Sequence, residues 1–265
     1  MKNVLLIGNS RFGKVLLEKL RALAEVEVAT HDWREKLAGK DWVVVATPVA
    51  THAEIVRECL QNGLNVFAEK PLDENPDTVK SLIELSVAQN KRLYIDDVFL
   101  WRPEYKHIKS LAAPISEISF RITKYGTFND SLLAAHIYHD LYMLADLTNF
   151  APISDLNIIN VASPLEPGRV DVIEFSLRAG DINVHASYDR TQEIKQKKII
   201  INQNIAWQDK SLTVDGAQVT LPEHDAISNM LEGVLSEKVN FTYNNKLALV
   251  ATTLLASIKK KVEEK

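Results

Sequence analysis

The sequence predicts an α/β domain with a doubly wound parallel sheet of the Rossmann type, followed by an α+β domain with a mostly antiparallel sheet backed by helices. Three observations support this prediction. Short apolar runs alternate with helical periodicity over the first 100 residues, a glycine turn follows the first run, and β-branched segments dominate from about residue 115. We therefore expect a first domain over residues 1–115 and a second over residues 116–265.

The first half of the chain contains five apolar runs that we expect to be strands, namely residues 4–7, 26–30, 42–46, 65–68 and 92–95. Helical spacing of apolar residues follows three of them, over residues 14–23, 51–60 and 76–89. Thr51 and the Asn75-Pro76 pair are typical helix starts. Strands that alternate with helices imply a parallel sheet covered on both faces, with ligands bound at the carboxyl ends of the strands.

The second half changes to segments rich in β-branched residues. The expected strands are residues 115–123, 156–162, 170–178, 181–188, 197–202 and 212–214, and Ala179-Gly180-Asp181 is a hairpin signal. One helix is expected between the first two strands, over residues 131–150, and two in the tail, over residues 222–235 and 244–263. This pattern predicts a sheet backed by helices.

Composition narrows the possible partners. Hydrophobic residues make up 46% and charged residues 25% of the chain, and the net charge of -4 shows no basic bias that would recruit nucleic acid. The single cysteine, Cys59, has no intrachain disulfide partner, and the first residues lack the apolar stretch needed for export or membrane insertion. We expect a cytoplasmic protein that acts on a small molecule.

The glycine turn is the first candidate site. Gly8, Ser10 and Gly13 occupy the small-residue positions of G-x-G-x-x-G between a strand and a helix, with Arg11 and Phe12 in between. In this motif the backbone approaches the pyrophosphate of a dinucleotide at the helix N-terminus. Serine departs from the motif, but it is small and its hydroxyl could donate to a phosphate. The alternative is an ordinary turn that binds nothing.

Two residues after the second strand point to different cofactors. Asp32 lies at the distance where an acidic residue contacts the ribose hydroxyls of NAD. Arg34 favours NADP, because a guanidinium there could hold the 2'-phosphate. The sequence therefore predicts NAD or NADP and leaves the choice open.

Residues 43–72, VVVATPVATHAEIVRECLQNGLNVFAEKPL, resemble the glucose-fructose oxidoreductase, inositol dehydrogenase and MocA family of nicotinamide-dependent enzymes. Two motifs carry the resemblance: Ala46-Thr47-Pro48 with His52, and Glu69-Lys70-Pro71. Residues 94–111, YIDDVFLWRPEYKHIKSL, are similar to the segment that follows the fifth strand in this family. The resemblance implies that the first domain binds the dinucleotide and that the second binds substrate and forms the oligomer.

Within this family Lys70 would lie beside the nicotinamide and the substrate hydroxyl, where an ammonium group stabilises a developing alkoxide and relays a proton. Glu69 would then fix or tune Lys70. The alternative for this pair is an exposed ion pair of little consequence. The expected cofactor contacts are Gly8, Ser10, Arg11, Phe12, Gly13, Asp32, Thr47, Pro48, His52, Glu69 and Lys70.

A helix of the second domain supplies the other expected catalytic residue. In the family this helix presents an aspartate and, four residues later, a histidine; LLAAHIYHDL, residues 132–141, matches best with His139 as that histidine. His139 would exchange the substrate proton near neutral pH. Ala135 then occupies the aspartate position, and His136, three residues before His139, lies on the same helix face as His139. The competing alignment makes His136 the family histidine, with Leu132 in the aspartate position, and loses the match to H-D-L. We expect no metal at His136, His139 and Asp140, because nicotinamide hydride transfer requires none.

Three functions remain open at this point. The leading prediction is an NAD(P)-dependent oxidoreductase that acts on a hydroxyl or ketone of a sugar or nucleotide sugar. Because Ala135 replaces the expected aspartate, the alternative is a catalytically impaired dinucleotide-binding regulatory protein of the same fold. A reductase of an imine or tetrapyrrole would share the cofactor domain. A homodimer or homotetramer through the second domain is also expected.

Overall fold

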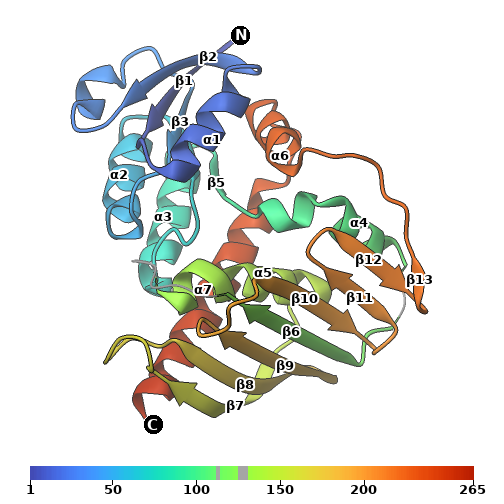
Figure 1. The fold of residues 1–265 in the computed structure, drawn as a ribbon. Coiled ribbons are helices and arrows are strands. Elements are labelled where there is room, and N and C mark those ends of the chain that lie inside the picture. The colour runs from blue at the N-terminus through green and yellow to red at the C-terminus, as the bar shows by residue number, and fades with distance from the viewer. Residues whose placement is uncertain (112–113, 125–130) are drawn as a thin grey trace. The chain divides into compact units, whose positions relative to one another are not determined.

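The computed structural model describes residues 1–111, 114–124 and 131–265, and these divide into two compact units (Figure 1). The first unit comprises Met1–Trp101 with Asp225–Thr253, and the second comprises Arg102–His224 with Leu254–Lys265. This division differs from the boundary expected at residue 115. Two tail helices contribute to the first unit: α6 (Ala226–Leu235) and the first part of α7 (Phe241–Glu263).

The first unit contains the parallel sheet that the apolar runs predict. Its strands are β1 (Lys2–Ile7), β2 (Ala24–Ala29), β3 (Trp42–Val45), β4 (Asn65–Ala68) and β5 (Leu93–Ile95), in the order β2-β1-β3-β4-β5. The connecting helices are α1 (Arg11–Leu20), η1 (Trp33–Lys36), α2 (Val49–Gln61), α3 (Pro76–Ala88) and η2 (Val98–Trp101). The predicted Rossmann-type topology is confirmed.

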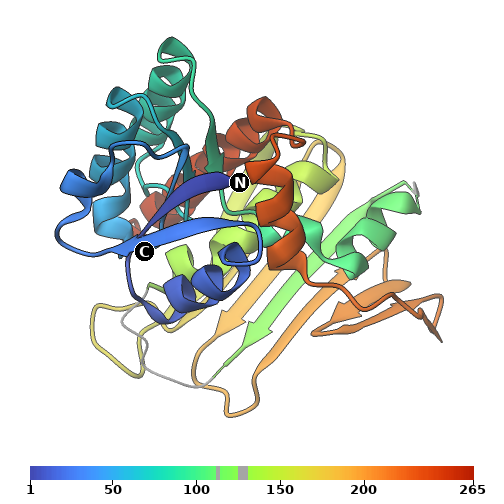
Figure 2. The same ribbon diagram turned by 90° about the horizontal axis from the view of Figure 1, so that it is seen from above.

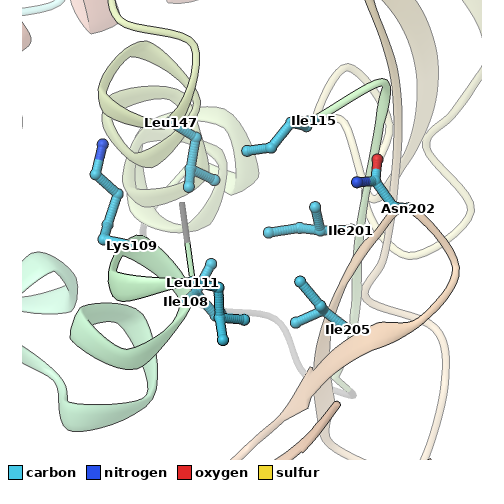
Figure 3. Close-up of a pocket in the computed structure, with 8 residues that line it drawn as sticks. All are labelled: Ile108, Lys109, Leu111, Ile115, Leu147, Ile201, Asn202 and Ile205. Carbon is cyan, nitrogen blue, oxygen red and sulfur yellow. The ribbon is translucent and has the colours of Figure 1, made fainter. Parts of the chain in front are cut away.

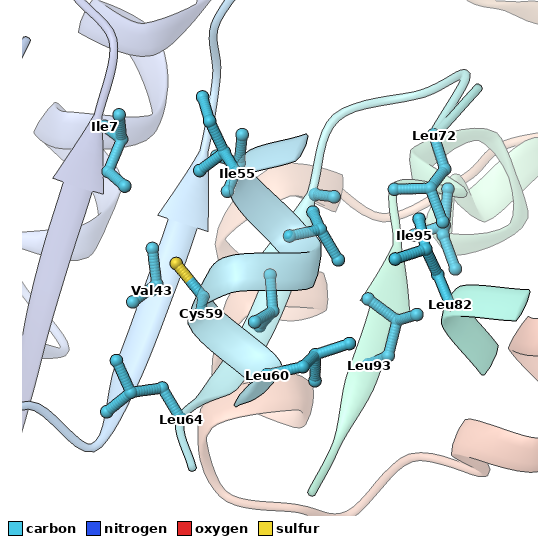
Figure 4. Close-up of a cluster of buried hydrophobic side chains, with 14 of the residues drawn as sticks. Ile7, Val43, Ile55, Cys59, Leu60, Leu64, Leu72, Leu82, Leu93 and Ile95 are labelled. Atoms are coloured by element: carbon cyan, nitrogen blue, oxygen red, sulfur yellow. The ribbon is translucent and has the colours of Figure 1, made fainter. Parts of the chain in front are cut away.

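Apolar side chains cover both faces of this sheet, as the continuous apolar runs require. On one face, Ile55 and Cys59 of α2 and Leu82 of α3 pack on the sheet (Figure 4). Ala248 of α7 belongs to the same cluster. On the other face, Leu16 and Leu20 belong to α1, and Met230, Leu231 and Val234 belong to α6. Figure 2 shows α1, in dark blue, on the opposite side of the sheet from α2 and α3.

The order in which strands are added to the sheet reverses at β1, next to the glycine turn. Strand β1 pairs with β2 on one side and β3 on the other, so Ile7 lies between Ala29 and Val45. In open parallel sheets, ligands bind outside the carboxyl ends of the strands at such a switch point. Gly8 follows β1 directly at this position.

The second unit contains an eight-stranded mixed sheet with the order β13-β12-β11-β10-β6-β9-β8-β7. Strands β6 and β9 pair in parallel, and the other neighbours are antiparallel. The strands are β6 (Glu117–Thr123), β7 (Ile153–Ala162), β8 (Val172–Ala179), β9 (Ile182–Asp189), β10 (Gln196–Ile201), β11 (Ile205–Gln208), β12 (Ser211–Val214) and β13 (Ala217–Gln218). The mostly antiparallel sheet and the β8–β9 hairpin at Gly180 are confirmed.

Three short elements of this unit were not predicted: α4 (Pro103–Ser110), β11 and β13. The expected helix over residues 131–150 begins as a π-helical turn, η3 (Leu133–Ile137), and continues as α5 (Tyr138–Leu147). Among the described residues, no helix is both long and apolar enough to span a bilayer.

The two faces of the second sheet differ in character. One face is buried and apolar, with Phe120, Phe175 and Ile199 among its residues. The opposite face carries polar side chains of intermediate or high exposure: Ser119, Arg121, Glu174, His185 and Ser187. The homodimer or homotetramer stays a prediction.

Candidate functional site

The turn after β1 accepts only glycine at its first position. Gly8 has a φ of +116°, and a Cβ there would lie 2.3 Å from the Ala46 carbonyl oxygen at the end of β3. At Gly13, a Cβ would lie 3.0 Å from the Gly8 oxygen. Gly8 thus packs directly against the backbone at the end of β3, and Gly13 packs against Gly8.

Ser10 has a structural role in this turn. Its Oγ accepts a hydrogen bond from the Gly13 amide at 3.0 Å as the N-cap of α1, and it donates to the Ala46 oxygen at 3.3 Å. The expectation that this hydroxyl donates to a phosphate is therefore not supported. Backbone N–H groups at the start of α1 are the better donors, and the first turn of α1 carries no acidic residue. Arg11 is exposed there, and Phe12 packs on the core.

Asp32 lies at the carboxyl end of β2, where an acidic residue was expected. It is exposed, and its Oδ2 contacts the Lys36 ammonium at 2.8 Å. The hydrogen bond from Lys36 lowers the pKa of Asp32, so this carboxylate is ionised at neutral pH. An ionised carboxylate is an acceptor for ribose hydroxyls.

His52 connects the loops that follow β3 and β4. It is 1% exposed, and its two ring nitrogens lie 2.7 Å from the Thr47 oxygen and 2.9 Å from the Pro71 oxygen. Both partners only accept, so both contacts are hydrogen bonds when the ring is protonated, whereas burial lowers the pKa of His52. The buried ring holds the two loops together. We therefore assign it a positioning role in place of the expected contact with a cofactor, which Thr47 and exposed Pro48 could still make.

Glu69 and Lys70 follow β4, and the register of the sheet brings a second carboxyl to this point. Ala68 pairs with Ile95, so Glu69 and Asp96 lie side by side at adjacent strand ends. Burial, and next the Asp96 charge, raise the pKa of Glu69 well above its usual value; burial also raises the pKa of Asp96. The positive charge of Lys70 opposes both shifts.

Asp97 forms a separate buried cluster. Its Oδ1 accepts hydrogen bonds from Tyr94 Oη at 2.5 Å and Trp101 Nε1 at 3.1 Å, and its Oδ2 accepts from Asn244 Nδ2 at 3.0 Å. Burial raises the pKa of Asp97 to about 7 despite these donors. Asn244 of α7 also contacts the backbone N–H and C=O of Ile95, at 2.9 and 2.8 Å, and so joins α7 to edge strand β5.

In the second unit, the adjacent residues His139 and Asp140 have different environments. His139 is half-buried, with Nδ1 2.9 Å from Tyr142 Oη. Asp140 is buried, accepts from Tyr188 Oη at 2.9 Å and lies 2.6 Å from Lys197 Nζ. Asp140 therefore joins α5 to strands β9 and β10.

The helix turn before His139 carries no carboxylate. Four residues before His139, one α-helical turn, lies Ala135, the position of the expected aspartate. Five residues before it, as in a π-helical turn, lies Ala134. Among the described residues, no group of three or more histidine, cysteine, aspartate or glutamate side chains could hold a metal ion.

The predicted site residues are divided between the two units. At the carboxyl ends of β1, β3 and β4 in the first unit lie the glycine turn, Thr47-Pro48 and Glu69-Lys70. His139 belongs to the second unit. That unit also has a mostly apolar cavity of about 190 Å³ that contains no predicted site residue (Figure 3). Asp96 was missed by sequence reasoning, although the paired aspartates at a predicted strand end were a signal.

The chain is similar to a known protein family and to several characterised proteins. The model of the glucose-fructose oxidoreductase, inositol dehydrogenase and MocA family, described as an oxidoreductase family with an NAD-binding Rossmann fold, matches residues 16–96. Inositol 2-dehydrogenase of Rubrobacter xylanophilus is 36% identical over 66 residues, 25% of this chain and 19% of that protein. Trans-1,2-dihydrobenzene-1,2-diol dehydrogenase of Xenopus laevis is 33% identical over 120 residues, 42% of this chain and 36% of that protein.

These matched stretches span about a fifth and about a third of the curated relatives. A solved structure extends the likeness of fold to nearly the whole chain. UDP-N-acetylglucosamine 3-dehydrogenase GnnA from Acidithiobacillus ferrooxidans has a TM-score of 0.87 over 98% of this chain and 97% of that chain, at 15% identity. The predicted resemblance to the oxidoreductase family is confirmed.

Proposed function

From this relationship, we propose that the chain is a dehydrogenase or reductase that uses NAD or NADP to interconvert a ring hydroxyl and the matching ketone of a sugar or nucleotide sugar. The observation that carries the proposal is the position of Lys70. It follows β4, at the same carboxyl end of the parallel sheet as the glycine turn, and lies near the buried carboxyls of Glu69 and Asp96. The three similar proteins are named for an inositol, a dihydrobenzene diol and a sugar nucleotide.

The residues after β1 fit a dinucleotide. Gly8 and Gly13 allow the turn to pack closely at the switch point, and the start of α1 offers N–H groups with no acidic side chain in its first turn. Asp32 would accept from the adenosine ribose. When bound, the nicotinamide supplies or accepts the hydride.

Lys70 would act on the oxygen of the substrate. An ammonium group donates a hydrogen bond to this oxygen and stabilises the negative charge that develops there. Two adjacent buried carboxyls favour holding one proton between them, and the negative charge that remains on Glu69 and Asp96 would attract the Lys70 ammonium. His52 would hold the segment that carries Lys70, through the Pro71 oxygen.

His139 is proposed as the residue of the second unit that exchanges the substrate proton with water. An imidazole titrates near neutral pH and can both accept and return a proton. The Tyr142 hydroxyl, 2.9 Å from Nδ1, orients the ring, and the Asp140 anchor fixes the helix that carries it.

The test is turnover by the purified chain with NAD(H) and NADP(H) against a panel of inositols, sugars and nucleotide sugars, followed by nicotinamide absorbance. We expect activity with at least one pair. Lys70→Ala should lower kcat about 100- to 10,000-fold while NADH binding, measured by fluorescence, is retained. Lys70→Arg is the matched control that keeps the charge but changes its geometry. Unchanged kcat in Lys70→Ala would contradict the proposal.

A dinucleotide-binding regulatory protein is the second candidate, and Ala135 in place of the expected aspartate favours it. This candidate predicts tight NADH binding with no turnover across the panel, and no effect of His139→Ala on any ligand-linked property. Turnover that is lost in both Lys70→Ala and His139→Ala would exclude it.

A further inference from the structure

A salt-bridge cluster at the end of β2 bears on which dinucleotide the site accepts. Arg34, the residue that a 2'-phosphate would need, donates from Nε to both carboxylate oxygens of Glu58 at 2.8 and 2.9 Å. Its Nη2 donates to Glu54 Oε1 at 3.1 Å, and its guanidinium stacks 4.3 Å from the centre of the Trp33 ring. Glu54 and Glu58 lie one turn apart on α2, so a single helix face holds the guanidinium.

The next cation of this segment is also paired. Lys36 Nζ lies 2.8 Å from Asp32 Oδ2 and 3.6 Å from Glu27 Oε1. Glu27 in turn contacts Lys40 Nζ at 2.8 Å. Four carboxylates (Glu27, Asp32, Glu54, Glu58) thus accompany three cations (Arg34, Lys36, Lys40), which leaves the cluster with a net charge of -1.

We infer that the chain is specific for NAD and that Glu54 and Glu58 are the residues that make it so. The inference rests on the proposed function. A 2'-phosphate adds close to two negative charges and binds best to a bidentate guanidinium. In this cluster the phosphate must compete with Glu58 for Arg34 and lie near the Asp32 carboxylate. A 2'-hydroxyl needs no cation and donates to Asp32 instead.

The inference addresses the choice between NAD and NADP that Asp32 and Arg34 leave open in the sequence. Arg34 by itself favours NADP, and its pairing with Glu54 and Glu58 of α2 counteracts this preference. Removing the two glutamate charges while keeping side-chain length should therefore release Arg34 for the phosphate. Both glutamates are at the surface, so the change to glutamine leaves the core intact.

The experiment measures NADH and NADPH affinities of the full chain by nicotinamide fluorescence. Adenosine 2',5'-bisphosphate and 5'-AMP serve as competitors that carry and lack the 2'-phosphate. For the wild type we expect NADH to bind at least about tenfold more tightly, the order of one exposed charge contact. The double variant Glu54→Gln with Glu58→Gln should shift the NADPH-to-NADH affinity ratio about tenfold towards NADPH.

Glu84→Gln is the matched control. Glu84 is an exposed helix glutamate on α3, 4.0 Å from Lys80, and its removal should leave the ratio unchanged. Thermal melting shows whether each variant is folded. Equal or tighter binding of NADPH by the wild type would overturn the inference and leave the proposed function standing. An unchanged ratio in the folded double variant would overturn the role of the glutamates. If neither cofactor binds, the proposed function fails, and the inference fails with it.

Discussion

Replacing Gly8 by alanine tests the structural basis of the dinucleotide site. The new Cβ would lie 2.3 Å from the Ala46 oxygen, 2.7 Å from the Ala46 carbonyl carbon and 3.1 Å from the Thr47 nitrogen. All three atoms belong to the backbone at the end of β3, so no side-chain rotation relieves the contact. The φ of +116° is also unfavourable for alanine.

The two effects can be estimated separately. A non-glycine residue at such a backbone angle costs roughly 1–3 kcal/mol. Forcing one methyl group into a packed region costs roughly another 1–3 kcal/mol. Gly8→Ala should therefore lower the free energy of unfolding by about 4 kcal/mol and move the turn away from β3. Because this turn is the proposed pyrophosphate site, NADH binding should be lost in the variant that remains folded.

The assay is urea unfolding followed by tryptophan fluorescence, since Trp33, Trp42 and Trp101 all belong to the first unit. Gly39→Ala is the matched control, because Gly39 has a φ of +75° but no atom within 4 Å of the position that the new methyl group would take. This variant should lose only about 1–2 kcal/mol, from the backbone angle alone. Gly8→Ala that is no less stable than Gly39→Ala would refute the steric reasoning.

Two further predictions concern the buried polar groups of the first unit. Asn244→Ala removes three hydrogen bonds, two to the Ile95 backbone and one to Asp97, and should lower the free energy of unfolding by about 3–5 kcal/mol in urea. The exposed control Asn62→Ala should lower it by less than about 1 kcal/mol. Equal losses in the two variants would contradict the anchoring role of Asn244. Because the pKa of Asp97 rises on folding to about 7, the folded chain holds an extra proton between about pH 4 and 7. Unfolding free energy should thus fall with rising pH across this window, by up to about 4 kcal/mol, and level off above it. Asp97→Asn should flatten this part of the profile, and an unchanged slope would assign it to other groups.

Much of the first unit could be predicted because its strands are continuous apolar runs and two of its helices, α1 and α3, begin with a side-chain cap. The expected start at Thr51 was wrong: α2 begins at Val49 without a side-chain cap, and the Thr51 hydroxyl donates back to Thr47 and the Pro48 oxygen. Asn75 is one example: its side chain accepts from the Asp77 amide, as the Asn75-Pro76 start implies. The glycine turn was also predictable, since its sequence pattern reflects a steric need at Gly8. The shared reason is that these signals are local in the chain.

The features that escaped prediction depend on contacts between distant residues. Asp96 meets Glu69 only through the pairing of β4 with β5, and Asn244 reaches Ile95 from a helix 149 residues away. Similarly, the Ser10 hydroxyl, which follows β1, donates a hydrogen bond to the Ala46 oxygen at the end of the neighbouring strand β3. The assignment of tail helix α6 to the first unit has the same origin, because its apolar face fits the core against α1.

The balance between Arg34 and the acidic residues of α2 could not be decided from sequence either. Each residue type is common on a protein surface, and only the distances reveal that Glu54 and Glu58 hold the guanidinium. Likewise, the His139-Asp140 pair is adjacent in the chain, but the helix turns one residue towards the sheet and leaves the other half-buried.

Hydrogen–deuterium exchange with and without saturating NADH tests the central claim most directly. The proposed site predicts slower exchange in peptides that cover residues 8–13, 46–48 and 69–71, three segments that follow the carboxyl ends of β1, β3 and β4. The β7–β8 hairpin of the second unit should be unaffected and serves as the internal control. Binding of NADH without protection in these three segments would contradict the claim that the cofactor lies along this edge.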